Sequence, residues 1–177
     1  MKKMSTQKLV LSGLFIALGL VLPFLTGQIP MFGSMLLPMH IPVLLCGFIC
    51  GWPAGLLVGF VVPLLRSLLF AAPPMFPMAV SMAFELAAYG LMAGLIYQYL
   101  PRKPIYIYVN LIVSMIVGRI VWGIVSLILF QLSGSSFTLN FFLTAAFVNA
   151  VPGIILQLIL IPLIVMAVQK ANLMQNG

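Results

Sequence analysis

Long apolar runs separated by short breaks fill almost the whole chain, and this pattern limits what it can fold into. Hydrophobic residues make up 64% of the 177 residues and charged residues only 5%, with a mean hydropathy of +1.28. So few charges cannot cover the surface of a soluble domain. The sequence therefore predicts an all-α integral membrane protein that forms a single domain over residues 1–177.

Breaks rich in Gly and Pro divide the apolar sequence into six expected membrane crossings, since each crossing needs about 20 apolar residues. We expect these crossings near residues 9–25, 40–51, 54–71, 78–100, 105–132 and 141–168. The second is too short to span a bilayer unless the uncharged segment before it, 26–39, dips in beside it. We interpret the first as a transmembrane helix and not a signal peptide, because no small-residue cleavage pattern follows it.

The basic residues outside the apolar runs predict the orientation. In a six-helix arrangement they all fall on one side, and the three loops on the other side contain neither Lys nor Arg: Lys2, Lys3, Lys8, Arg102, Lys103 and Lys170. Basic loops stay on the cytoplasmic side of a membrane. We therefore expect both termini in the cytoplasm, and the net charge of +7 gives no reason to expect a nucleic-acid partner.

The stretch from Pro38 to Arg66 combines irregular backbone with polar side chains. Pro38 and Pro42 bracket the only histidine, His40, so the backbone there cannot be a regular helix throughout. Carbonyl groups left free by such a break need other partners inside a membrane. This combination indicates a binding site.

Further polar residues lie at similar depths in five different expected helices. A charge inside a crossing costs at least about 2.5 to 3.5 kcal/mol, so each needs a partner or a hydrated cavity. We predict one pocket, open to the outside, with Trp122, Tyr89 and Phe84 as apolar walls and Gln157 at a similar depth. Its expected substrate-binding residues are His40, Arg66, Glu85, Arg119, Trp122 and Asn149.

The charges in this set allow two interpretations. Arg66 could pair with Glu85, the single acid of the chain, as a buried ion pair that only fixes two helices. That pairing leaves Arg119 as an excess positive charge, which an anionic ligand group could neutralise through two parallel hydrogen bonds. His40 could contact a ligand or bond to backbone freed by its neighbouring prolines.

Catalysis and metal binding are hard to build from this inventory. A single carboxylate cannot form an acidic pair or an acidic metal cage, and one His with one Glu does not make a catalytic zinc site. The spacing of Cys46 and Cys50 is neither a redox nor a zinc pattern, and no nucleotide-binding G-x-x-x-x-G-K-[ST] occurs. We expect no enzyme activity, catalytic residue, metal or cofactor in this chain, so any use of ATP would need other subunits.

Two short patterns carry a resemblance to a known family. Gly13 and Ala17 are four residues apart, the small-xxx-small spacing that lets membrane helices approach closely, although internal packing would explain it too. The run His40-Ile41-Pro42-Val43 is followed by Cys46-Gly47 and by a glycine-spaced turn and helix over residues 51–59. Together these resemble the substrate-binding S components of energy-coupling factor (ECF) vitamin transporters, over nearly the whole chain.

The resemblance implies a multi-pass protein of a prokaryotic plasma membrane with six helices. In such proteins the segments corresponding to 26–39, 72–77 and 133–140 cover a vitamin in the outer half of the bundle. The resemblance further implies that Gly13 and Ala17 dock a transmembrane T component, and that two ATPase subunits drive release of the vitamin inside. Membrane lipid surrounds the remaining surface.

No motif identifies the vitamin. An excess positive charge in the pocket favours a carboxylate-bearing compound, with pantothenate first and pyridoxine or a thiamine precursor as other candidates. Two further classes stay open from the residues alone. One is a structural or assembly protein locked by an Arg66–Glu85 pair, and the other is a small self-contained transporter or channel that works as a dimer.

Overall fold

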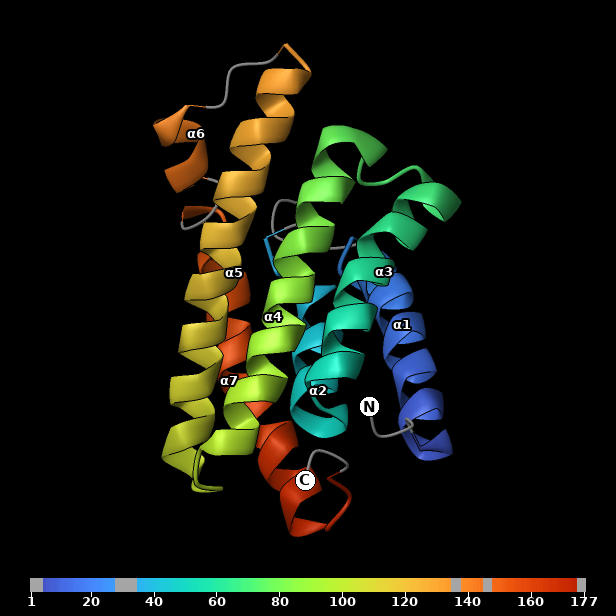
Figure 1. Ribbon diagram of the computed structural model, residues 1–177, viewed down its shortest axis with the longest axis vertical. Helices are drawn as coiled ribbons and strands as arrows, with labels where there is room; N and C mark the ends of the chain where they lie inside the picture. The colour runs from blue at the N-terminus through green and yellow to red at the C-terminus, as the bar shows by residue number, and fades with distance from the viewer. Residues whose placement is uncertain (1–4, 28–34, 135–137, 145–147, 175–177) are drawn as a thin grey trace.

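The computed structural model describes residues 5–27, 35–134, 138–144 and 148–174. Every regular element within these ranges is a helix (Figure 1): α1 Thr6–Gly27, α2 His40–Cys50, α3 Trp52–Phe70, η1 Met75–Ala79, α4 Val80–Tyr99, α5 Pro104–Leu132, α6 Leu139–Leu143 and α7 Val151–Lys170. Helices satisfy their own backbone hydrogen bonds, which a lipid environment demands. The predicted all-α fold is confirmed.

Five of the described helical segments are long and apolar enough to cross a membrane: α1, α3, η1 with α4, α5 and α7. The sixth apolar helix, α2, has 11 residues, and every one of them is buried. At 1.5 Å per residue it is about 17 Å long, roughly half of the hydrocarbon core. The short second crossing is therefore an internal half-helix, which packs against α1, α3, α4 and α7.

The last crossing is shorter than the sequence predicted. We expected one helix over 141–168, but α6 ends at Leu143 and α7 begins at Val151. Pro152 lies in the first turn of α7, a position where its missing N–H breaks no helical hydrogen bond. The proline thus starts a new helix and does not lie inside a longer one.

Glycines bring α3 and α4 into direct backbone contact. A Cβ atom added to Gly90 would lie 2.1 Å from the carbonyl oxygen of Gly55, and one added to Gly59 would lie 2.2 Å from that of Leu86. Side chains at these positions would force the two helices apart, so only glycine permits this packing. The contact fixes the rotation of α4 about its own axis, and α4 carries the only acid of the chain.

We expect Gly90→Ala to lower the free energy of unfolding by about 1 to 3 kcal/mol, the range for overpacking a filled interior. The added methyl group would meet rigid backbone, which cannot move aside as a flexible side chain could. Thermal unfolding in detergent measures the effect. Gly13→Ala is the matched control, because nothing among the described atoms lies within 4 Å of a Cβ added there. Equal melting temperatures for the two variants would contradict the packing argument.

The ends of the bundle agree with the charge pattern. Figure 1 places the start of α1, the turn from α4 to α5 and the end of α7 in its lower part, and these segments contain Lys8, Arg102, Lys103 and Lys170. The opposite end carries the turn from α3 to α4 and the end of α5. That the basic end faces the cytoplasm stays a prediction from the distribution of Lys and Arg.

Candidate functional site

The carboxylate of Glu85 is the centre of a buried polar cluster. Its Oε1 atom lies 2.8 Å from Arg119 Nη1 and 3.6 Å from His40 Nε2, and it accepts a hydrogen bond of 3.2 Å from the Tyr89 hydroxyl. Glu85 is only 2% exposed and Arg119 only 8%. The cluster joins three helices, because His40 opens α2, Glu85 and Tyr89 lie on α4, and Arg119 lies on α5.

Local sequence explains how the cluster assembles. Glu85 and Tyr89 are four residues apart and therefore share one face of α4. Gly118 makes room for the Tyr89 ring, since a Cβ atom there would lie 2.6 Å from two ring carbons. Its neighbour Arg119 thereby comes within reach of the carboxylate. A glycine on α5 thus allows the charged residues of two helices to meet.

The charge pairing corrects one interpretation of the sequence. Glu85 pairs with Arg119, and the suggested Arg66–Glu85 pair is wrong, as is the expectation that Arg119 is the excess charge. Arg66 instead faces α1, where its Nη1 donates a 2.8 Å hydrogen bond to the Leu20 carbonyl. Within the described part of the chain, Arg66 has no carboxylate partner, since Glu85, the single acidic residue of the sequence, pairs with Arg119.

Aromatic rings hold the Arg66 guanidinium in place. Its central carbon lies 4.7 Å from the centre of the Phe24 ring and 5.7 Å from that of Phe70, and these two rings pack edge to face. Such cation–π contacts attract a positive charge but do not neutralise it. Arg66 is therefore a positioned cation with most of its five N–H donors unused by Leu20.

Two cavities lie next to the cluster. The first, the Arg66 cavity, has a volume of about 280 Å³, and its lining includes Thr26, Leu37, Pro38, His40 and Arg66. The second, the Gln157 cavity, has a volume of about 150 Å³, and its lining includes Leu37, Tyr89, Met115, Arg119 and Gln157. Each cavity is therefore lined by members of the Glu85 cluster, and Leu37 lines both cavities.

Leu37 occupies an unusual backbone conformation between the cavities. Its φ angle is +51°, in the left-handed region that residues with a branched side chain rarely adopt. Its carbonyl accepts the His40 N–H at 3.1 Å, and its side chain packs on Gly153 of α7, where an added Cβ would lie 2.9 Å from Leu37 Cγ. Strained residues of this kind concentrate at ligand sites.

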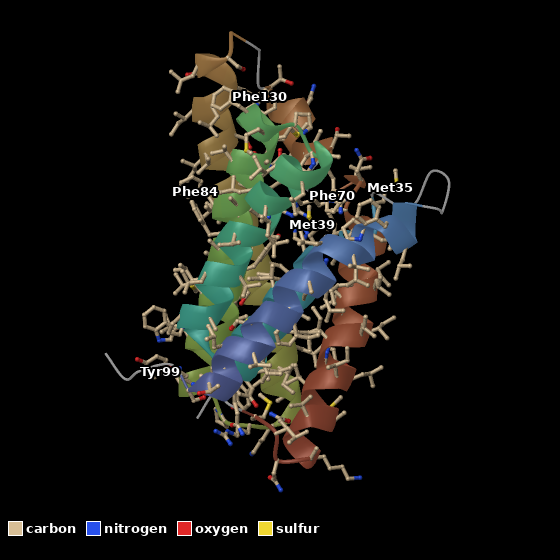
Figure 2. All side chains as sticks on the ribbon, turned by 90° about the vertical axis from the view of Figure 1, so that its right-hand side faces the viewer. Met35, Met39, Phe70, Phe84, Tyr99 and Phe130 are labelled. Atoms are coloured by element: carbon tan, nitrogen blue, oxygen red, sulfur yellow. The ribbon has the colours of Figure 1, made fainter. Side chains whose placement is uncertain are left out.

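The cluster lies toward the end of the bundle opposite the basic residues. Figure 2 shows Met35, Met39 and Phe70 in the upper half of the bundle and Tyr99 in the lower half, and Met39 lines the Arg66 cavity. If the basic end faces the cytoplasm, the Arg66 cavity lies in the half of the bundle that faces outward, the depth that the sequence predicted for the pocket.

Three other predicted pocket residues lie elsewhere. Phe84 is 44% exposed at the outer edge of the bundle (Figure 2) and packs against Phe60, so its assignment as a pocket wall is wrong. Trp122 is buried one turn beyond Arg119, where its ring stacks on Phe142 of α6. Asn149 is exposed in the turn before α7. Among the described residues, the linings of the two cavities include neither Trp122 nor Asn149.

Tyr89 and Gln157 contribute more to the site than the sequence suggested. Tyr89 was expected as an apolar wall, but its hydroxyl bonds to Glu85, and the spacing of four residues could have revealed this. Gln157 was noted only for its depth. It is 2% exposed, and its Nε2 atom has no hydrogen-bond partner among the described atoms.

Gly13 and Ala17 lie on the exposed face of α1. Only 17% of the most apolar 18-residue stretch of this helix is buried within the bundle, so most of α1 faces away from the other helices. Internal packing of the described helices therefore does not explain the small-xxx-small spacing. The face is accessible to a helix of another chain.

The fold and the cluster define a multi-pass helical membrane protein with an enclosed polar site. Residues 7–165 match the family described as "ECF transporter, substrate-specific component", and the chain belongs to this family. The resemblance inferred from the sequence is thereby confirmed. No curated protein and no solved structure matches the chain.

Proposed function

We propose that this chain captures a small water-soluble vitamin outside a prokaryotic cell and takes part in its uptake across the plasma membrane. The observation that carries the proposal is the buried Glu85 cluster with a cavity on either side, in a chain of the ECF substrate-specific family. Polar and charged groups inside a membrane are expensive and mark functional sites by default.

The charge distribution favours a ligand with a carboxylate. Glu85 compensates Arg119, whereas among the described residues the Arg66 guanidinium contacts a carbonyl oxygen and two aromatic rings, none of which carries a negative charge. A carboxylate in the Arg66 cavity could accept two parallel hydrogen bonds from the free edge of the guanidinium. Pantothenate therefore stays our first candidate. We propose that its carboxylate binds at Arg66 and not, as the sequence suggested, at Arg119.

The partners in this proposal follow from the family. A transmembrane T component would dock on the Gly13 and Ala17 face of α1, and two ATPase subunits would supply the energy of ATP hydrolysis. Release inside would then require a movement driven by those subunits, since this chain contains no nucleotide-binding motif. The chain acts as a transporter subunit and not as an enzyme.

Mass spectrometry of small molecules retained by the purified protein tests the proposal directly. We expect a carboxylate-bearing vitamin, and added pantothenate should raise the melting temperature of the emptied protein. Retention of no small molecule, with no stabilisation by any water-soluble vitamin, would contradict the proposed function.

We expect Arg66→Gln to weaken binding of pantothenate by roughly 10- to 150-fold, the loss equivalent to one hydrogen bond between charged groups. Glutamine removes the positive charge and the planar fork but keeps an N–H donor. Arg66→Lys should bind better than Arg66→Gln but worse than wild type, because an ammonium keeps the charge without the planar fork. Isothermal titration in detergent measures the affinities, with the exposed variant Phe84→Leu as the control that should bind normally. Wild-type affinity in Arg66→Gln would exclude Arg66 as the carboxylate site.

A further inference from the structure

Gln157 carries a buried amide nitrogen that has no hydrogen-bond partner among the described residues. It lies on α7 and lines the Gln157 cavity, and its Nε2 atom is inaccessible and unpaired among the described residues. Most of its neighbours in the cavity lining are apolar: Leu37, Ile112, Met115, Ile116, Ile154 and Leu158. A leucine would suit these surroundings better than an amide does.

An unmade hydrogen bond in such a place is unfavourable, and buried polar groups in proteins are nearly always paired. A second glutamine of α7 shows the usual arrangement, because Gln169 donates to the hydroxyl of Tyr97. The cavity beside Gln157 is large enough for a molecule that brings its own polar group, or for water while that molecule is absent. Gln157 thus offers a hydrogen bond to an occupant of the cavity.

The two cavities differ in charge. In the Gln157 cavity the positive charge of Arg119 is balanced by Glu85 at 2.8 Å, so this pair contributes no net charge. In the Arg66 cavity the guanidinium has no carboxylate beside it among the described residues. A carboxylate therefore favours the Arg66 cavity, and an uncharged group favours the Gln157 cavity.

We propose that Gln157 determines specificity by binding an uncharged carbonyl, amide or hydroxyl group of a molecule whose carboxylate lies at Arg66. This inference rests on the proposed function, and it defines the substrate as a carboxylate with an uncharged polar group at its other end. The Gln157 amide can present either its N–H donors or its carbonyl oxygen. Leu37 lines both cavities, so a molecule that reaches from one to the other would contact its side chain.

Two pairs of probes separate the charged end from the uncharged end: pantothenate with panthenol, and nicotinate with nicotinamide. The second member of each pair lacks the carboxylate. Gln157→Leu should lower the affinity for both members of whichever pair the wild-type protein binds. The expected loss is about 10-fold, the value of one hydrogen bond to an uncharged group. Arg66→Gln should weaken the carboxylate and leave its uncharged counterpart unchanged.

Melting temperatures without any probe distinguish this role from a structural one. Gln157→Leu should melt at or above the wild-type temperature, because it removes an unpaired buried amide. Gln169→Leu is the matched control on the same helix. It should melt below wild type, since it breaks the bond to Tyr97, and it should bind the probes with wild-type affinity.

Three other results would each contradict a specific part of this proposal. Wild-type affinity in Gln157→Leu, for a probe that the wild-type protein binds, would overturn the specificity role and leave the proposed function intact. A melting temperature well below wild type in Gln157→Leu would show that the amide has a structural partner, which also overturns it. Failure of the wild-type protein to bind either carboxylate would overturn the carboxylate assignment itself, and the role of Gln157 with it.

Discussion

Arg119→Met alone should lower the free energy of unfolding by about 3 to 5 kcal/mol, the cost of removing one partner from a buried ion pair. The Glu85 carboxylate, which is 2% exposed, would lose the guanidinium at 2.8 Å and would keep only Tyr89 and His40 beside it. Glu85→Leu alone should have a similar cost, because it leaves the Arg119 guanidinium without its counter-charge. Unfolding in detergent measures both changes.

The double variant Glu85→Leu/Arg119→Met should recover most of that loss, because no uncompensated charge remains. Replacing a whole buried pair by apolar residues is often neutral or even stabilising. The difference between the double variant and the sum of the single variants gives the coupling energy of the pair. Single effects that simply add would contradict a direct Glu85–Arg119 interaction.

The same double variant separates a structural lock from a binding site. Arg119 and Tyr89 line the Gln157 cavity and His40 lines the Arg66 cavity, so we expect the folded double variant to bind pantothenate more weakly than wild type. A folded double variant with full affinity would show that the cluster only holds α2, α4 and α5 together.

Gly13→Leu or Ala17→Leu should reduce vitamin uptake in cells to background, while the purified chain binds the vitamin with wild-type affinity. Both residues lie on the exposed face of α1, and helix association in lipid depends on close van der Waals contact. A leucine there would keep the T component at a distance. Uptake of radiolabelled pantothenate, in cells that also produce the T component and the ATPases, measures transport.

Val109→Phe is the control for added bulk. Val109 is also exposed, but it belongs to α5, a helix that lies on the side of the bundle away from α1 (Figure 1). This variant should transport normally. Normal uptake in Gly13→Leu and Ala17→Leu would show that the T component docks elsewhere. Weakened vitamin binding by the purified variants would show that this face of α1 has a structural role instead.

The sequence predicted those features that depend on neighbouring residues alone. Hydropathy and length predict helices that cross a membrane, because a lipid environment requires each segment to satisfy its own backbone. The turn at Gly51 was predicted for a similarly local reason. Its φ angle of +96° is one that glycine adopts without strain, and Pro53 lies in the first turn of the next helix.

Features that depend on how helices rotate against one another could not be read from the sequence. Arg66 and Arg119 are both arginines deep in apolar helices, and either could have paired with Glu85. Glycine contacts between α3 and α4 fix the face that Glu85 presents, and Gly118 lets α5 approach Tyr89, so that Arg119 reaches the carboxylate. Arg66 faces α1 instead. The tertiary structure thus decided which charge is neutralised and which is free for a ligand, because an ion pair forms only where backbone packing brings both groups within a few ångströms.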